Sequence, residues 1–415
     1  MNLYAIIILT TIVVSYLLSL ITETLNLKAL REDLPEEFEG VYDAEVYKRS
    51  QEYTRVKTKF GFITSTFSIA LTLVFWFAGG FNFLDQIVRS WNLHPILTGI
   101  VYIGILIFIK ALLSLPFSVY ATFVIEERFG FNKTTPVTFV TDILKELLLA
   151  VVLGGPLLAG VLAFLQYAGA LAWLYCWIAT TIFILFVHFI APTWIMPLFN
   201  KFTPLEDGEL KKAIISYAHS VKFALQNVFV MDGSKRSSKT NAFFTGFGKN
   251  KRIALFDTLI EKHTVPELVA VLAHEIGHYK KKHILQGMTI SIIHMGVMFF
   301  LLSIFISHEG LFRAFYMEHV SIYAGLIFFG MLYSPIELIL SIFMQIFSRK
   351  NEYEADRFAA ETTENPESMI EALKKLSVHN LSNLTPHPLY VFLNYSHPPT
   401  LERIKALRQV ERSHS

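Results

Sequence analysis

The sequence predicts a mostly α-helical polytopic membrane protein with seven transmembrane helices and a hydrophilic domain that is split in two along the chain. Hydrophobic residues make up 53% of the 415 positions and charged residues only 17%. The mean hydropathy of +0.46 is too high for a soluble domain of this length. The apolar residues also gather in runs long enough to cross a hydrocarbon core of about 30 Å.

Seven apolar runs are candidate transmembrane helices. The third and seventh are longer than a bilayer requires, so we expect them to tilt or to continue beyond it. The first lacks a basic flank and a small-residue cleavage site, which favours a retained anchor over a signal peptide. The predicted spans are 3–22, 60–84, 96–124, 146–168, 171–195, 286–307 and 321–347.

The distribution of Lys and Arg predicts the orientation of these spans. The segments after spans one, three, five and seven carry 7, 3, 14 and 9 basic residues, whereas those after spans two and six carry only Arg89 and Arg313. The positive-inside rule then places the N-terminus outside and the C-terminus in the cytoplasm. A net charge of +2 gives no indication of nucleic-acid binding, and the single Cys176 excludes an intramolecular disulfide.

The chain divides into four segments at the boundaries of these runs. Residues 1–195 hold the first five transmembrane helices with their cytoplasmic loops, and 286–347 hold helices six and seven. Residues 196–285 and 348–415 are the two halves of a peripheral domain, which membrane folding must bring together. Within the first half, residues 227–232 are expected to form a strand.

A small β-hairpin is predicted in the first half of this domain. Residues 241–246 and 252–256 are rich in strand-forming types and flank a turn at 248–251. If the first strand has a free edge, Asn241 and Ala242 would present it to an extended peptide. A structural hairpin without a free edge is the alternative.

The segment His274-Glu275-Ile276-Gly277-His278 contains the pattern HExxH. Residues four apart share one face of a helix, so both imidazoles can bind one metal ion, with Glu275 beside it as a general base. The preceding run 265–273 has apolar residues at helical spacing and Pro266 near its start, which predicts a rigid helix. A charged amphipathic helix with solvated histidines is the alternative.

A third ligand is expected because catalytic zinc keeps three protein ligands and one open position. Glu352 and Asp356 follow the last span and are four residues apart, on one helix face. Glu352 is the candidate ligand, and Asp356 would accept a hydrogen bond from a ligand imidazole. Glu354 points elsewhere on the helix and is interpreted as a solvated surface acid.

These motifs, with several other blocks in order along nearly the whole chain, resemble the membrane zinc metalloprotease family of the type I CAAX prenyl protease, the Ste24 group. The resemblance implies seven helices around a large chamber, closed at its cytoplasmic end by the zinc domain. The matching blocks are EERFGFNKTT (126–135), PLFNKFTPL (197–205), DGSKRSSKTNAFFTGFGKNKRIALFDTLI (232–260), HEIGH (274–278), SRKNEYEADRFA (348–359) and NYSHPPTLERIKAL (394–407).

The resemblance also implies roles for individual residues. It assigns one zinc ion to His274, His278 and Glu352, and the general base to Glu275. The other implied roles are substrate-backbone contact for Asn241 and Ala242, oxyanion stabilisation for His397 and a position beside the substrate for Arg403.

The implied activity is hydrolysis of a peptide bond near the C-terminus of a prenylated protein, by a monomer in the lipid bilayer. Two alternatives remain: a quality-control protease without prenyl selectivity, and a non-enzymatic scaffold or transporter. The short connection at 307–321 favours a bacterial inner-membrane protein, with the endoplasmic reticulum as the location in a eukaryote. The sequence does not assign a role to Lys110, His188 or Glu337, which lie in or near spans, where helix pairing and chamber lining compete with function.

Overall fold

The computed structural model describes residues 1–225, 227–245 and 252–414, most of which are helical. Among these residues, seven helices are long and apolar enough to cross a membrane, which confirms the predicted number. They are Leu3–Lys28 (α1), Ala44–Phe77 (α2), Pro95–Glu126 (α4 and its π-helical end), Pro136–Tyr167 (α5 and α6), Gly169–Phe199 (α7 and α8), His283–Phe305 (α12) and Ile322–Thr363 (α14).

The second predicted span, 60–84, is wrong at both ends. The helix α2 starts at Ala44, within the polar region, and ends at Phe77. Gly79 then adopts a left-handed conformation with φ of 74°, which a helix cannot continue through, and a separate helix α3 runs over Gly80–Ser90. The apolar run therefore contains a helix end that hydropathy alone does not reveal.

The fourth and fifth spans form the predicted antiparallel pair around Gly169. Helices α6 (Gly155–Tyr167) and α7 (Ala172–Ile190) flank this glycine, whose φ of 61° allows the chain to reverse. The fourth span begins ten residues earlier than predicted, with α5 (Pro136–Leu149) continuing into α6 through a π-helical segment, Ala150–Gly154.

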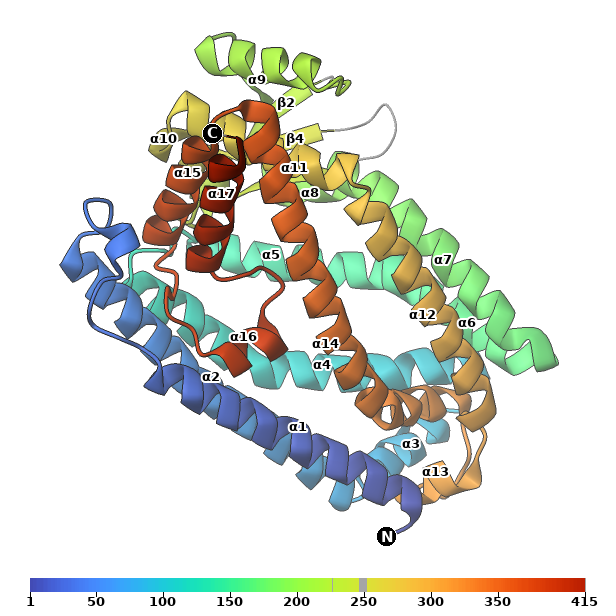
Figure 1. The fold of residues 1–415 in the computed structure, drawn as a ribbon. Helices are drawn as coiled ribbons and strands as arrows, with labels where there is room; N and C mark the ends of the chain where they lie inside the picture. The colour runs from blue at the N-terminus through green and yellow to red at the C-terminus, as the bar shows by residue number, and fades with distance from the viewer. Residues whose placement is uncertain (226, 246–251, 415) are drawn as a thin grey trace.

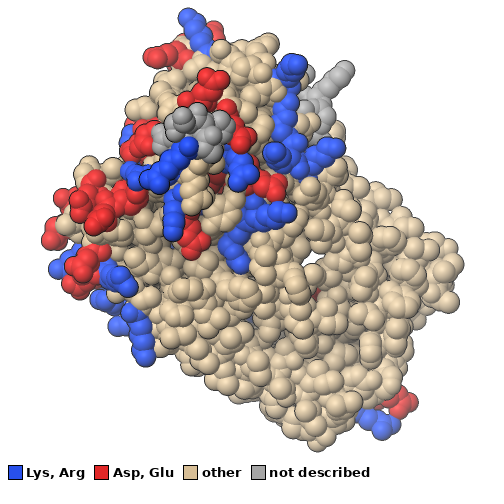
Figure 2. Space-filling view, in the orientation of Figure 1, with Lys and Arg blue, Asp and Glu red and all other residues tan. Residues whose placement is uncertain are grey.

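The surface of the molecule divides into a charged end and a largely uncharged part (Figure 2), and the chamber implied by the resemblance stays a prediction. Charged side chains gather at one end of the molecule, over the hydrophilic domain and the adjoining helix ends, while most of the rest of this face is uncharged and has an opening in it (Figure 2). The N-terminus lies at the opposite end from the C-terminus (Figure 1). Near the N-terminal end, aromatic rings pack the helices together, among them Phe315 and Phe328, which stack at 3.9 Å.

The hydrophilic domain contains a four-stranded sheet rather than a hairpin alone. Its strands are β1 (Phe202–Pro204), β2 (Asn227–Met231), β3 (Ala242–Thr245) and β4 (Arg252–Phe256), in the order β1-β2-β4-β3. The antiparallel pairing of β3 with β4 confirms the hairpin, and β3 lies at an edge. The predicted turn at 248–251 lies outside the described residues. The sequence analysis missed β1, which has only three residues and contains Pro204.

Helices complete both halves of this domain. The first half contributes α9 (Glu209–Ser220), α10 (Asp257–Lys262) and α11 (Val265–Lys280). The second half contributes α15 (Pro366–His379), α16 (Pro388–Asn394) and α17 (Thr400–His414). Between the halves, α12 and α14 are joined through α13, Glu309–Ala314.

The helix α14 is continuous from the membrane into the hydrophilic domain. Its 42 residues rise about 63 Å along the helix axis, twice the thickness of a hydrocarbon core. The boundary predicted between residues 347 and 348 falls inside it without a break. One continuous helix, with Pro335 in its membrane part, thus connects the bilayer to Glu352 and Asp356.

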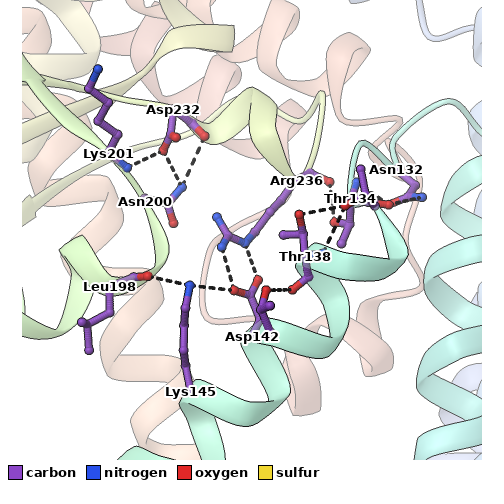
Figure 3. Close-up of polar contacts among 12 residues, drawn as sticks. Asn132, Thr134, Thr138, Asp142, Lys145, Leu198, Asn200, Lys201, Asp232 and Arg236 are labelled. Carbon is purple, nitrogen blue, oxygen red and sulfur yellow. Dashed lines mark hydrogen bonds and ion pairs between the residues drawn. The ribbon is translucent and has the colours of Figure 1, made fainter.

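Polar contacts hold the loop before β3 against the membrane helices (Figure 3). Arg236 donates two hydrogen bonds to the Asp142 carboxylate of α5, at 2.7 and 2.9 Å. Lys145, one turn further along α5, lies 3.6 Å from Asp142 and donates to the carbonyl of Leu198 at 2.8 Å. Because Arg236 precedes β3 by six residues, these contacts fix the start of the sheet edge relative to the bundle.

Candidate metal centre and cleft

The helix α11 presents His274 and His278 on one face. Its start is defined by a capping box between Thr264 and Glu267, with Pro266 in the first turn. The apolar face of α11 packs into the core of the hydrophilic domain. This packing fixes the orientation of the two imidazoles, which lie on the other face of the helix. Their Nε2 atoms are 3.1 Å apart and so converge on a single point.

The carboxylate of Glu352 on α14 reaches the same point. Its oxygens lie 3.5 Å from His274 Nε2 and 3.2 Å from His278 Nε2. Tetrahedral zinc with bonds of about 2.0 Å requires ligand atoms about 3.3 Å apart, so the three side chains fit such an ion. Glu352 Oε2 is buried without a hydrogen-bond partner among the described residues, as suits an oxygen that binds a cation.

Gly277 allows α11 and α14 to approach closely enough for this convergence. A Cβ atom at Gly277 would lie 3.2 Å from the Ala355 backbone and 3.1 Å from the Phe358 ring. Any larger side chain would therefore push Glu352 away from the histidine pair. The glycine inside the HExxH pattern thus has a packing role.

Asp356 lies one turn beyond Glu352, on the same buried face of α14. Its Oδ1 is 2.9 Å from His274 Nδ1, the distance expected for the predicted hydrogen bond. Burial lowers the pKa of His274, but the hydrogen bond and charge of Asp356, together with the charge of Glu352, outweigh it, so the pKa is raised overall.

Arg403 on α17 is buried against these acids. It donates two hydrogen bonds to Asp356, at 2.7 and 2.6 Å, and its Nη1 lies 3.4 Å from Glu352 Oε2. The guanidinium therefore neutralises two buried carboxylates, although part of Arg403 also lines the cleft described next. The sequence alone did not reveal these contacts.

A cleft of 440 Å³ opens beside His274 and Glu352. Burial raises the pKa of the Glu275 carboxyl at its wall, and the neighbouring His274 and His278 partly offset this effect. His397 stands at the same cleft, largely exposed, with its Nε2 3.3 Å from Glu352 Oε1. Asn241 and Ala242, at the start of β3, complete the wall. The structure therefore brings all the predicted site residues to one place.

A chain of contacts that was not predicted from the sequence joins His278 to His283 and Glu354. The Nδ1 atom of His283 lies 3.1 Å from His278 Nδ1, and its Nε2 lies 3.2 Å from Glu354 Oε2. Glu354 is therefore not simply a solvated acid as predicted, since its carboxylate contacts a buried imidazole. The signal was present in the sequence as a third histidine, five residues after His278 and three residues before the predicted span 286–307.

Glu337, one of the intramembrane polar residues singled out from the sequence, contacts a second membrane helix. Its Oε1 lies 3.5 Å from Nε2 of His294, which also contacts the hydroxyl of Tyr333 at 3.0 Å. These residues connect α12 and α14, which supports a helix-pairing role. The side chains of Lys110 and His188 are both exposed.

Comparison with known proteins identifies the family. Residues 23–201 match the CAAX prenyl protease N-terminal family, described as five membrane helices, and residues 204–411 match peptidase family M48. The chain belongs to peptidase family M48. This M48 peptidase is thus a multi-pass membrane metallopeptidase, and family membership implies a bound metal, which the three converging side chains fit.

Its similarity to characterised proteins extends over nearly the full length. CAAX prenyl protease 1 of Saccharomyces cerevisiae is 36% identical over 408 residues, covering 91% of this chain and 89% of the relative. The CAAX prenyl protease 1 homolog of Homo sapiens is 32% identical over 424 residues, covering 91% and 89%. The crystal structure of S. mikatae Ste24p has a TM-score of 0.92 and 33% identity, covering 98% of this chain and 99% of that one.

These similarities confirm the predicted family, the fold and the class of enzyme. They exclude the non-enzymatic scaffold or transporter as the main interpretation, because the chain matches a peptidase family over its whole second half.

Proposed function

We propose that this M48 peptidase hydrolyses a peptide bond near the C-terminus of prenylated proteins, using one zinc ion held by His274, His278 and Glu352. The convergence of these side chains beside Glu275, in a cleft bordered by a strand edge, carries the proposal. The printed names of the relatives, CAAX prenyl protease 1, support the substrate class.

Each residue of the cleft would have a separate role in the hydrolysis. A zinc ion in this site would supply Lewis-acid polarisation of the scissile carbonyl. Glu275 would take the proton of the attacking water and pass it to the leaving amine. The imidazole of His397 would donate a hydrogen bond to the developing oxyanion.

The remaining site residues would position these groups. Asp356 would hold the His274 imidazole in the tautomer that leaves Nε2 free for the metal, and Arg403 would keep Asp356 ionised. Ala242 and Asn241 would bind the substrate as an added strand, which demands little of its side chains.

We further propose that the chain is a monomer with its N-terminus outside and its peptidase domain in the cytoplasm, as the distribution of basic residues predicts. The proposed location is the bacterial inner membrane, or the endoplasmic reticulum membrane in a eukaryotic cell.

Prenyl dependence is tested with two peptides that differ only in the farnesyl group on one cysteine. We expect the purified protein to cleave the farnesylated peptide with kcat/KM at least about 10-fold higher, since burying an isoprenoid contributes roughly 0.8 kcal/mol per CH₂ group. Mass spectrometry of the products, with and without a chelator, measures both the cut and its metal dependence. Equal cleavage of the two peptides would instead favour a quality-control protease without prenyl selectivity.

The contact behind His278 is tested by His283→Phe, which keeps a planar ring but removes both polar contacts. We expect zinc affinity to fall about 10-fold, the lower range for partners that orient a metal ligand. Competition with a chelator measures this affinity. Lys281→Met, an exposed change at the same helix junction, is the matched control. Wild-type affinity in the His283 variant would show that the contact does not support the metal site.

A further inference from the structure

The open edge of β3 is closed off at Thr240. The N–H of Phe256 donates to the carbonyl of Asn241 at 3.2 Å, so the backbone of Asn241 faces β4 and that of Ala242 faces the open edge. At Thr240, the side-chain amide of Asn380 forms hydrogen bonds with both backbone groups. Its Oδ1 accepts from the Thr240 N–H at 3.0 Å, and its Nδ2 donates to the Thr240 carbonyl at 3.2 Å. A peptide paired with Ala242 therefore cannot continue along the edge past Asn380.

A second cavity, of 750 Å³, begins where this edge ends. It lies between the loop that leads into β3 and the helices α1 and α2. The cleft and this cavity share four lining residues, namely Thr240, Asn241, Asn380 and Ser382. A peptide that leaves the edge at Asn380 thus has a continuous path into the cavity.

One wall of the cavity carries two ammonium groups around a single aromatic ring. The Nζ atoms of Lys57 and Lys239 lie 5.0 and 5.1 Å from the ring centroid of Tyr53. Lys239 is neutralised by Glu126 at 2.8 Å, whereas no salt bridge of Lys57 is found within the described part of the chain. Glu23 of α1 also lines the cavity, and its carboxylate accepts a hydrogen bond from the hydroxyl of Tyr390 at 3.3 Å. The Lys57 side chain is accessible from the cavity, so its charge is available to an anion.

The direction of the bound peptide decides which of its ends reaches these lysines. Antiparallel pairing is the commoner arrangement, and β3 already uses it with β4. A peptide antiparallel to β3 runs toward Thr240 and Lys239, so the residues after the scissile bond approach the cavity. Three residues span about 10 Å in extended form, which is the reach from Ala242 back to Lys239 along the strand.

We propose that this cavity binds the free C-terminal carboxylate of the substrate through Lys57, which lies beside the neutralised Lys239, and that Asn380 ends the strand pairing so that the residues beyond the cut enter the cavity. This inference rests on the proposed peptidase function and adds a determinant to it. A substrate that ends about three residues after the cut gains this charge contact, whereas a longer substrate would place uncharged backbone beside the Lys57 ammonium.

The test uses the full-length protein and two farnesylated peptides that differ only at the last residue, which is a free acid in one and a carboxamide in the other. A hydrogen bond to a charged group contributes roughly 1.5–3 kcal/mol, so we expect kcat/KM of the wild type to be roughly 10- to 100-fold higher for the acid. In Lys57→Met, this acid-to-amide ratio should fall to within about threefold of one. Because both peptides are compared in one variant, partial misfolding does not change the ratio.

Lys59→Met is the matched control, since Lys59 is an exposed lysine of the same helix that does not line the cavity. It should keep the wild-type ratio. Equal cleavage of acid and amide by the wild type would overturn this inference while leaving the proposed function intact, as would a preference that persists in Lys57→Met. Cleavage of neither peptide would overturn the proposed function and the inference with it.

Discussion

Glu275→Gln is expected to lower kcat for peptide hydrolysis by on the order of 1000-fold while leaving the metal content unchanged. The amide keeps the size of the side chain but cannot accept a proton from water, and general-base catalysis contributes roughly 100- to 10,000-fold. The three metal-binding side chains do not include Glu275, so zinc measured per mole of purified protein should stay at the wild-type value. Turnover at the wild-type rate would remove Glu275 from the role of base.

The pH dependence of the wild type gives a second measurement of the same group. Burial raises the pKa of Glu275, so the carboxylate is lost on acidification at a higher pH than for an ordinary glutamate. We therefore expect kcat/KM to decrease as the pH falls through that raised pKa. A rate that stays constant down to the usual range of carboxyl groups would contradict this assignment.

Glu352→Ala is expected to weaken zinc binding by on the order of 100-fold or more and to abolish chelator-sensitive hydrolysis. The change removes one of three converging ligands, a larger loss than the 10- to 100-fold effect of an orienting partner. It also leaves Arg403 Nη1 without the carboxylate that lies 3.4 Å away. Zinc affinity, measured by competition with a fluorescent chelator, is the direct readout.

The matched control is Glu361→Ala, an exposed acid on the same helix that lies outside the cleft. It should retain wild-type zinc affinity and activity. Stoichiometric, tightly bound zinc in the Glu352 variant would mean that another residue completes the metal site.

The sequence predicted the elements whose signals are local. Hydropathy gave seven spans because each run is apolar over its own length, and helical spacing placed His274 and His278 together because both lie on one short helix. The end of α2 was missed because Gly79, with its left-handed backbone, is surrounded by apolar residues on both sides. A short strand such as β1 depends on pairing with β2, which no pattern inside its three residues specifies.

The residues of the site could be predicted from the sequence, but most of the contacts between them could not. The position of Glu352 followed from the requirement for a third ligand and from its spacing to Asp356. The burial of Arg403 against Asp356, and the contact of His283 with Glu354, join residues 47 and 71 positions apart and depend on how the helices pack. The same holds for Asn380 at Thr240, a contact across 140 positions.

The continuity of α14 has a consequence for biogenesis. A ribosome synthesises the two histidines and the glutamate of the HExxH segment well before Glu352, and the helices α12 and α14 must enter the bilayer in between. A nascent or truncated chain would therefore hold an incomplete metal site. If the proposed function is right, the peptidase would therefore become active only after both helices have been inserted into the membrane.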